Sequence, residues 1–352
     1  MKLFVSVFCL FLFSSAIGTA QDTQYSQFFA APLRLNPALT ALFDGNFRLA
    51  AINRDQWRRS LEAPINSFTF SGDMRFKLRP KTNSNPDFWG AGVSFTTDRA
   101  GDFGLNTTNL SLSGAFHKAL DKNMQQYISA GFQVGVFQRN LSYGNVVFQD
   151  QFDGVNTYTL PTDEFLPANN YGYSDFSVGL HYTITPISSF KIAIGGAAHH
   201  LLEPNTSFYR DDVGTTGVTV TDVPLLRKYQ AHIAVTNDIN EAFSYTPRAM
   251  FLSQGRHQQI LLGLNLRYEI VESNGRAFQV GMWARPIRDL DGYDLAALVL
   301  MVGIEFDQLN IGLSYDASLS DFSSDFTRLS SFEISLRYVG EYQNDTFFCP
   351  EF

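Results

Sequence analysis

The sequence of 352 residues is poor in cysteine and in charge, and it has no long apolar run after its first twenty residues. Charged residues make up 17% of it, against about 25% in a typical soluble domain. The net charge is −8 and no cluster of Lys or Arg stands out, which argues against nucleic acid as a partner. The mean hydropathy of −0.09 is too polar for a bundle of transmembrane helices. Aromatic residues are plentiful at 14%, which excludes a disordered chain.

The first twenty residues have the pattern of a secretory signal peptide. Lys2 precedes an apolar run at 3–13, and small residues lead up to Ala20. A membrane anchor is the alternative, but the run is shorter than the roughly 20 residues that a spanning helix needs. We therefore expect a signal peptide at 1–20, cleaved after Ala20. Cys349 is then the one cysteine left, so no disulfide can form within the mature chain.

The rest of the chain repeatedly alternates apolar and polar residues. Between 65 and 76, Phe68, Phe70 and Met74 share one parity, whereas Ser67 and Thr69 share the other. A β-strand places these two sets on opposite faces, and a helical period would not give this pattern repeatedly. The longest later apolar run, at 295–304, has the length of a membrane β-strand. On this basis we predict strands at 46–54, 65–76, 88–97, 105–118, 126–137, 173–184, 190–199, 228–236, 243–254, 258–271, 277–286, 295–306, 308–317 and 330–340.

Fourteen strands is an even number, as in single-chain bacterial outer-membrane barrels. Alternation alone does not separate such a barrel from a soluble sandwich. The polar faces are rich in Gly, Ser, Thr, Asn and Gln, which suits a lumen, and long connections alternate with short ones. The predicted fold is therefore an all-β transmembrane antiparallel barrel in the outer membrane. Both termini are then periplasmic, and the two longest connections, near 138–172 and 200–227, face outward.

Segments outside the strands complete this division of the chain. We expect a turn-rich segment at 21–45, in the periplasm or the lumen, before a barrel at 46–340, and a periplasmic tail at 341–352. Aromatic residues near strand ends are expected to form interfacial girdles in contact with outer-membrane lipid. These are Trp57, Trp89, Tyr127, Tyr182, Tyr268, Trp283, Tyr315 and Tyr338.

The sequence offers no specific catalytic, cofactor or metal motif. His199 and His200 are adjacent, so on one strand they would point to opposite faces, and a hydrogen-bonded lumen histidine is the preferred interpretation over a metal ligand. No G-x-S-x-G sequence occurs, although a hydrolase assembled in space stays open. Loop acids such as Asp150 and Asp153 could bind calcium, but they lack the EF-hand pattern and are read as solvated carboxylates. Charged lumen residues are expected to pair with each other; they are Arg48, Arg54, Asp73 and Arg75.

Several motifs follow one another in a characteristic order. They are QDTQYSQFFAAPLRLNPAL at 21–39, RDQW at 54–57, DRAGDFGLNTT at 98–108, HHLLEPNTSF at 199–208, RKYQAH at 227–232 and FCPEF at 348–352. Together they resemble the PorP/SprF family of type IX secretion system outer-membrane proteins of Bacteroidota. The matching positions that we single out are Arg54, Gln56, Trp57, Asp98, Asp102, His200, Pro204, Asn205 and His232.

The resemblance implies a non-enzymatic role in secretion, with no cofactor. Members are linked to the secretion apparatus through a periplasmic peptidoglycan-binding lipoprotein. Some support the export or surface attachment of large proteins, including gliding adhesins, that carry a C-terminal secretion signal. A general porin or nutrient-uptake channel is the alternative function, and a soluble exported β-protein is a third.

Partner binding would need material at both ends of such a barrel. On the external loops we consider six aromatic residues as anchors, because aromatic residues dominate interface hot spots. They are Tyr143, Phe148, Phe152, Tyr158, Phe208 and Tyr209. The alternative is that these residues pack the loops onto one another. In the tail, Cys349 and Phe352 are candidates for a periplasmic contact, and a free thiol in a mobile tail is the alternative for Cys349.

Overall fold

The structure is a computed structural model that describes most of the chain. The described residues are 22–58, 61, 63–77, 87–101, 104–121, 125–144, 146–164, 166–208, 223–270, 275–289, 292–319 and 330–341. The predicted signal peptide lies outside them. So do four of the predicted site residues: Asp102, Tyr209, Cys349 and Phe352.

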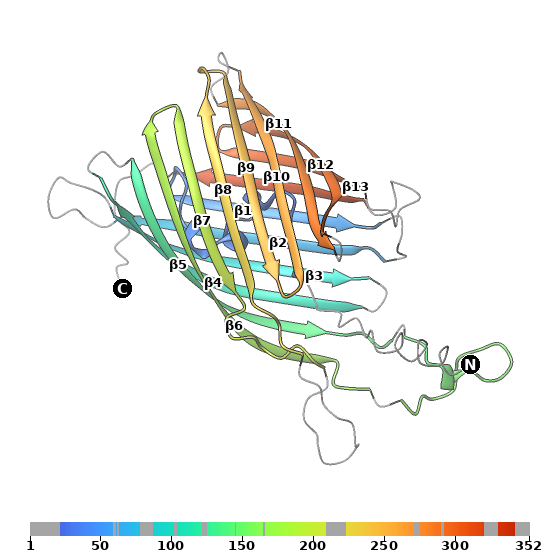
Figure 1. Cartoon of the computed structure of the whole chain (residues 1–352). Helices are drawn as coiled ribbons and strands as arrows, with labels where there is room; N and C mark the ends of the chain where they lie inside the picture. The colour runs from blue at the N-terminus through green and yellow to red at the C-terminus, as the bar shows by residue number, and fades with distance from the viewer. Residues whose placement is uncertain are drawn as a thin grey trace, which may run out of the picture.

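Fourteen antiparallel strands close into one barrel, in which each strand pairs with its neighbours in sequence and β1 pairs with β14 (Figure 1). The strands are β1 Phe47–Gln56, β2 Ile65–Lys77, β3 Phe88–Ala100, β4 Leu105–Ala119, β5 Gln126–Asn140, β6 Asn170–Ile187, β7 Phe190–His199, β8 Lys228–Asp238, β9 Phe243–Gln254, β10 His257–Glu269, β11 Arg276–Asp289, β12 Gly292–Phe306, β13 Leu309–Ser318 and β14 Ser331–Gly340. The predicted fold class is confirmed, and the predicted strands match these bounds to within a few residues. Within the described part of the chain, every helix is too short or too polar to cross a membrane.

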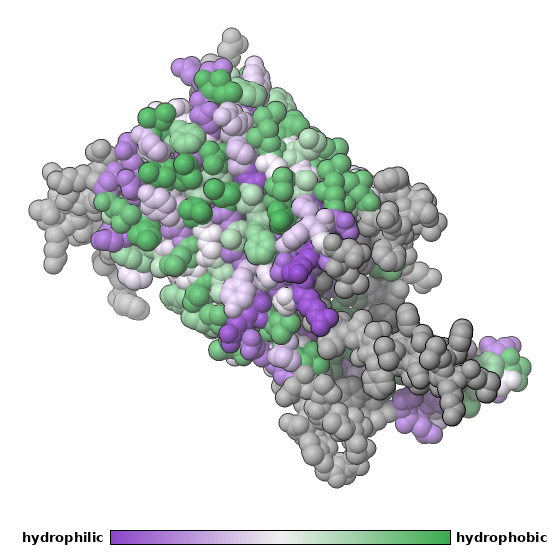
Figure 2. All heavy atoms as spheres, in the orientation of Figure 1, coloured by the Kyte–Doolittle hydropathy of each residue, from purple (hydrophilic) through white to green (hydrophobic). Residues whose placement is uncertain are grey.

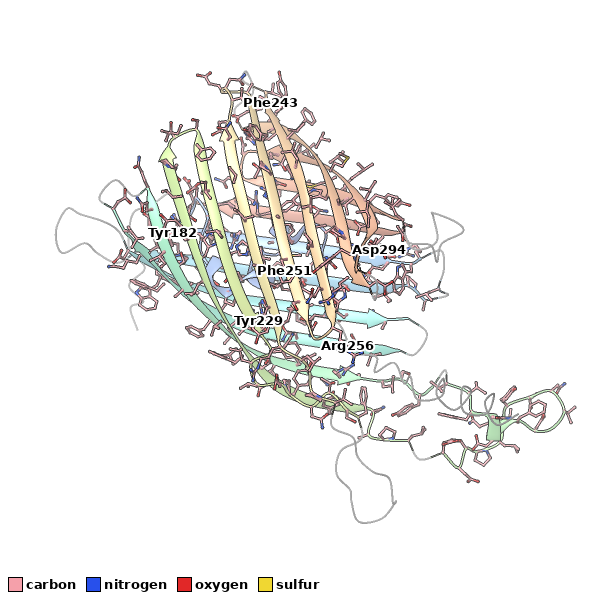
Figure 3. All side chains as sticks on the ribbon, in the orientation of Figure 1. Tyr182, Tyr229, Phe243, Phe251, Arg256 and Asp294 are labelled. Carbon is pink, nitrogen blue, oxygen red and sulfur yellow. The ribbon has the colours of Figure 1, made fainter. Side chains whose placement is uncertain are left out.

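The alternation in sequence becomes an apolar outer wall and a polar lumen. In β2, Phe70 and Phe76 point outward and are 41% and 51% exposed, whereas Ser67 and Asp73 are buried inside. Apolar side chains dominate the outer wall in view, and hydrophilic ones gather toward its ends (Figure 2). On the same wall Phe251 lies at mid-height, and Arg256 lies at one end (Figure 3). This inside-out distribution is the one expected of a barrel surrounded by lipid.

The two ends of the barrel differ in their connections. At one end, which we call the turn end, strands are joined by tight turns such as 188–189 and 307–308. At the other, the loop end, β5 connects to β6 through 141–169 and β7 connects to β8 through 200–227. The described part of the first connection contains the short helix η3 (Gln149–Gln151) and reaches well away from the barrel (Figure 1).

The N-terminal segment, residues 22–45, folds into three short helices inside the barrel. They are η1 (Phe28–Ala30), α2 (Pro32–Leu35) and η2 (Pro37–Leu39). Proline starts α2 and η2, where its fixed φ suits a first helical turn and its missing N–H costs nothing. The Asn36 side chain accepts a hydrogen bond from the Ala38 N–H at 2.9 Å and so caps η2. Figure 1 shows this segment within the ring of strands.

The apolar core lies where this segment packs against the inner wall. One cluster joins Phe28 and Leu35 to Met250, Leu261, Trp283 and Val299 of the barrel. The prediction that Trp283 belongs to an aromatic girdle was therefore wrong: it is 2% exposed, and its ring lies 5.6 Å from that of Phe28. The residue before it, Met282, faces outward instead, because successive side chains on a strand alternate between faces.

Candidate functional site

A buried ionic cluster holds the start of the N-terminal segment at the loop end. The Asp22 carboxylate accepts hydrogen bonds from the Lys228 ammonium and from Nε2 of His200, the latter at 2.9 Å. Nδ1 of His200 lies 2.7 Å from Asp175, so the ring bridges two carboxylates. Arg34 lies 3.7 Å from Asp22. These contacts fix Asp22 between β6, β7 and β8.

The charges in this cluster shift the pKa values of both partners. Burial opposes the charged form of Asp22, but Lys228 and His200 outweigh it and hold the pKa of Asp22 well below its usual range. Burial likewise opposes the charge on His200, but the Asp22 and Asp175 carboxylates raise its pKa above the ordinary value. The raised pKa favours the imidazolium, the form in which both ring nitrogens donate, one to each carboxylate.

The backbone at His200 explains why the two adjacent histidines share one side. His200 follows the last residue of β7 and has a φ of +59°, so the alternation of the strand stops there. Both His199 and His200 are buried, with ring centroids 6.4 Å apart. The expectation that they point to opposite faces was wrong. Among the described residues, no three His, Cys, Asp or Glu side chains come together in an arrangement that could hold a metal ion.

A second buried cluster ties the segment to the seam between β1 and β14. The backbone N–H groups of Ser26 and Gln27 donate to Glu333 at 2.7 and 2.9 Å. Arg54 donates to Glu333 and lies 3.0 Å from Asp316. Asp316 also pairs with Arg285 at 2.8 Å. The cluster thus joins the segment to four strands, β1, β11, β13 and β14.

Between these clusters and the turn end, the segment lies directly on bare strand backbone. A Cβ added at Gly131 of β5 would lie 2.5 Å from the backbone nitrogen of Ala38 and 2.5 Å from the carbonyl carbon of Pro37. The Asn36 amide donates to the carbonyl oxygens of Leu180, at 2.9 Å, and Gly196, at 3.2 Å. Close contact of this kind is possible only where the strand lacks a side chain.

The segment is anchored again before it enters β1. The Ala41 N–H donates to Asp73 at 2.6 Å, and Arg48 pairs with the same carboxylate at 2.6 Å. Nε2 of His117 lies 2.7 Å from the Thr40 carbonyl oxygen. The segment therefore occupies the lumen from the loop end toward the turn end. At the loop end, the void beside Asp22 measures only about 30 Å³.

A larger cavity of about 650 Å³ remains between the segment and the turn end. Its mouth is lined by Gln125, Ser188 and Ser189, which belong to the turn-end connections. Its wall carries both arginine and aromatic side chains. Arg75 lies over the Phe88 ring at 4.3 Å, and Arg248 lies over the Phe29 ring at 4.5 Å. The predicted motif residue His232 lies here too, with Nε2 3.3 Å from Nδ1 of His181.

The predicted aromatic anchors at the loop end are partly engaged within the loops. Phe152 and Tyr158 form a ring pair with centroids 5.1 Å apart, yet they remain 40% and 53% exposed. The Tyr143 hydroxyl donates to the Pro167 carbonyl at 3.1 Å. Phe208 packs edge-on against Tyr171 at 5.1 Å. Phe148 precedes η3, and its N–H donates to the Gln151 side chain at 2.9 Å.

The candidate calcium-binding acids of this loop are occupied by hydrogen bonds. The Asp153 carboxylate accepts from the Thr157 hydroxyl at 2.6 Å and from the Val155 N–H at 2.9 Å. These bonds lower the pKa of Asp153. Asp150 accepts from the Asp163 N–H at 2.7 Å, and this bond lowers its pKa as well. Both acids therefore stabilise the turns of the loop in its described form.

The other motif residues lie apart from one another. Gln56 ends β1, and Trp57 follows it with a φ of +59° and is 37% exposed. Asp98 is in β3, and Pro204 lies in the connection after β7. The Asn205 side chain in that connection accepts from the Ser207 N–H at 3.0 Å.

Sequence reasoning missed Glu333, Asp316, Lys228 and Arg248, although each has the inward parity of its strand. A charged residue at an inward position was the signal that could have found them. The same reasoning placed Arg48, Arg54, Asp73 and Arg75 in the lumen as a set expected to pair. Of these, Arg48 and Asp73 pair with each other, whereas Arg54 pairs with Asp316 and Glu333.

Comparison with known proteins gives one match that spans the barrel. The model of the family described as type IX secretion system membrane protein PorP/SprF matches residues 17–338. No curated protein matches the chain.

Solved barrels are similar only in outline. A FadL homologue from Pseudomonas aeruginosa has a TM-score of 0.47 at 11% identity and covers 86% of this chain and 92% of its own. The toluene transporter TbuX from Ralstonia pickettii has a TM-score of 0.45 at 11% identity, with 89% and 94% covered. The toluene transporter TodX from Pseudomonas putida has a TM-score of 0.46 at 11% identity, and the match covers 91% of this chain and 94% of TodX.

Proposed function

Because the chain belongs to the PorP/SprF family of type IX secretion system membrane proteins and forms an outer-membrane β-barrel, we propose that it is a non-enzymatic support for a secreted partner protein. The partner is a surface protein with a C-terminal secretion signal, such as a gliding adhesin. The barrel aids its export and its attachment at the cell surface. The observation that carries this proposal is the filled lumen, which leaves the two ends of the barrel for partner contacts.

The loop end is the proposed partner surface. Long loops of outer-membrane barrels lie outside the cell, which would put the loop end at the surface. The exposed ring pair of Phe152 and Tyr158 offers large apolar area there, as interface anchors do. Tyr143, Phe148, Phe208 and Tyr209 are the further candidates around it.

The turn end is the proposed site of a periplasmic contact. A peptidoglycan-binding lipoprotein is the partner that the family implies. Residues 22–41 are engaged inside the lumen, so this contact would fall to the turn-end connections and to the tail at 341–352, with Cys349 and Phe352.

Cross-linking in whole cells, followed by purification from outer membranes and mass spectrometry, tests the proposal. We expect recovery of a large protein with a C-terminal secretion signal and of a periplasmic lipoprotein. Phe152→Ala with Tyr158→Ala should reduce recovery of the surface protein. Val155→Ala is the matched control, because Val155 is 78% exposed in the same loop but carries no ring. Equal recovery from all variants would refute the role of the ring pair.

A general porin is the alternative function, and single-channel recording separates the two. The filled lumen predicts no steady conductance from the purified barrel in planar bilayers. A stable open channel, with no protein partner recovered, would favour the porin.

A further inference from the structure

The cavity at the turn end carries three cations for which the described residues provide no ion pair. Among the described residues, Arg75, Lys191 and Arg248 line the cavity, and none forms an ion pair with a carboxylate. The acidic residues on the cavity wall are Asp44 and Asp238. This concentration of positive charge occurs in a protein whose net charge is −8. Lys191 is exposed, and Arg75 donates to the carbonyl oxygens of Ala41 and Phe43. Arg248 is the half-buried cation of the three without such partners, and because half-buried cations are normally paired, it points to a missing anion.

Two of the polar groups here also lack hydrogen bonds. Nη1 of Arg248 and Nδ1 of His232 are buried and have no partner in the described part of the chain. Arg248 lies over the Phe29 ring at 4.5 Å, so an aromatic face holds its guanidinium plane while the N–H edge stays free. A free guanidinium edge is suited to binding a carboxylate through two N–H groups.

Small inward residues of β7 and β8, Ala193 and Ala234, line the cavity beside these groups. Gly195 lets the His181 and His232 rings lie against bare strand backbone, because an added Cβ would lie 2.7 Å from Nδ1 of His181 and 2.7 Å from Cε1 of His232. The cavity volume of about 650 Å³ is in the range of ligand pockets, roughly 300–1,000 Å³. Leu42 and Phe43 add apolar side chains to the lining.

We propose that this cavity binds an acidic peptide segment, in which carboxylate side chains alternate with aromatic or aliphatic ones, presented from the turn-end side. A carboxylate reaches Arg248 and Lys191, and the apolar side chains pack on Leu42 and Phe43. The wall mixes rings with cations along its length, which suits such a segment better than the continuous chain of a fatty acid. The proposal concerns the site alone and holds for whichever partner occupies the loop end.

Fluorescence anisotropy on the purified full-length barrel in a nonionic detergent tests this site. The probe is a fluorescein-labelled peptide of alternating aspartate and phenylalanine, compared with its asparagine counterpart. Arg248→Gln should weaken binding of the aspartate peptide by about tenfold, because a charge-assisted pair is lost. Lys118→Gln should leave binding within about twofold, since Lys118 carries the same charge near the same end but does not line the cavity.

A second variant and a competition experiment complete the test. If Arg248→Gln fails to fold, as judged by heat-modifiable migration on gels, the exposed Lys191→Gln serves in its place, with an expected loss of about threefold. Equal binding of the two peptides, or of the variant and the wild type, overturns the proposal. If laurate displaces the peptide at a concentration below the dissociation constant of the peptide, the site is reassigned to a fatty acid.

Discussion

Arg54 and Glu333 lie directly opposite each other on β1 and β14, the two strands whose pairing closes the barrel. Both side chains point inward and are almost fully buried, and they are hydrogen-bonded to each other. Glu333 also accepts from the backbone of Ser26 and Gln27 in the N-terminal segment. One ion pair therefore links the seam of the barrel to the segment that fills it.

Removing one partner of this pair should strongly destabilise the barrel. Arg54→Met leaves the Glu333 carboxylate buried without its cation, and we expect a loss of roughly 3–5 kcal/mol in the free energy of unfolding. Urea unfolding in detergent, followed by tryptophan fluorescence, measures it. Arg58→Met is the control, because Arg58 pairs with Asp55 in an exposed position and should change stability by less than about 1 kcal/mol. Similar losses in both variants would contradict the assigned role of Arg54.

The contact between Gly131 and the segment predicts a contrast between two glycines. Gly131→Ala puts a methyl group against the backbone of Pro37 and Ala38, which should cost about 1–3 kcal/mol and loosen the segment. In Gly196→Ala the added methyl group meets its nearest neighbour, the Gln230 carbonyl oxygen, at an ordinary 3.6 Å, so the free energy of unfolding should change by less than about 0.5 kcal/mol. Protease accessibility of the segment, together with urea unfolding, checks both. If the segment is as well protected from protease in Gly131→Ala as in the wild type, the contact with Gly131 does not hold the segment in place.

The cluster of Asp22 and His200 should make attachment of the segment depend on pH. The pKa of His200 is raised in the folded state, so its stabilising effect is complete below the ordinary histidine value of about 6.5 and is lost as pH rises through the folded pKa. The pKa of Asp22 is lowered, so its effect is lost only when acid protonates it, well below that range. Stability should therefore fall as the pH rises from about 6.5 through the folded pKa of His200.

Two variants identify the group responsible for this pH dependence. His200→Gln and Asp22→Asn should each flatten the slope, because each removes the interaction that raises the pKa of the ring. Unfolding midpoints across the pH series provide the measurement. A slope unchanged in His200→Gln would assign the effect to another group.

Trp283 should contribute more to stability than a tryptophan on the outer wall. Its ring is stacked 5.8 Å from that of Phe29, and truncation to Ala leaves a hole under the segment, with an expected loss of about 3–5 kcal/mol. Trp89→Ala is the comparison, because Trp89 is 48% exposed on the outer wall and leaves no enclosed hole. Thermal unfolding in detergent distinguishes the two, and a larger loss for Trp89→Ala would reverse this assignment.

The strands and their inward faces were predictable because the alternation of a barrel wall is local. Ser67 and Asp73 could be assigned to the lumen from parity alone. The position of the N-terminal segment could not be predicted in this way, since its prolines mark turns but give no direction in space. The glycine at 131 was a usable signal, because a bare position on an inward face indicates that another backbone comes close.

The errors at Trp283 and His200 have separate physical causes. Trp283 was assigned from residue type, because tryptophan is common at membrane interfaces, whereas its parity on β11 placed it inside. His200 was assigned from strand parity, which fails at a residue of positive φ just beyond a strand. The ionic clusters also depend on pairs far apart in the chain, such as Ser26 with Glu333, which no local pattern connects.

Residues 22–41 contact both seam strands, so the filling of the barrel and its closure are thermodynamically coupled. Ser26 and Gln27 donate to Glu333 of β14, and Arg54 of β1 donates to Ser26. Displacement of the segment would leave the buried Glu333 carboxylate without two of its donors, and an open seam would leave the segment without this anchor. The segment therefore acts as an internal clasp on the last strand pair of the barrel.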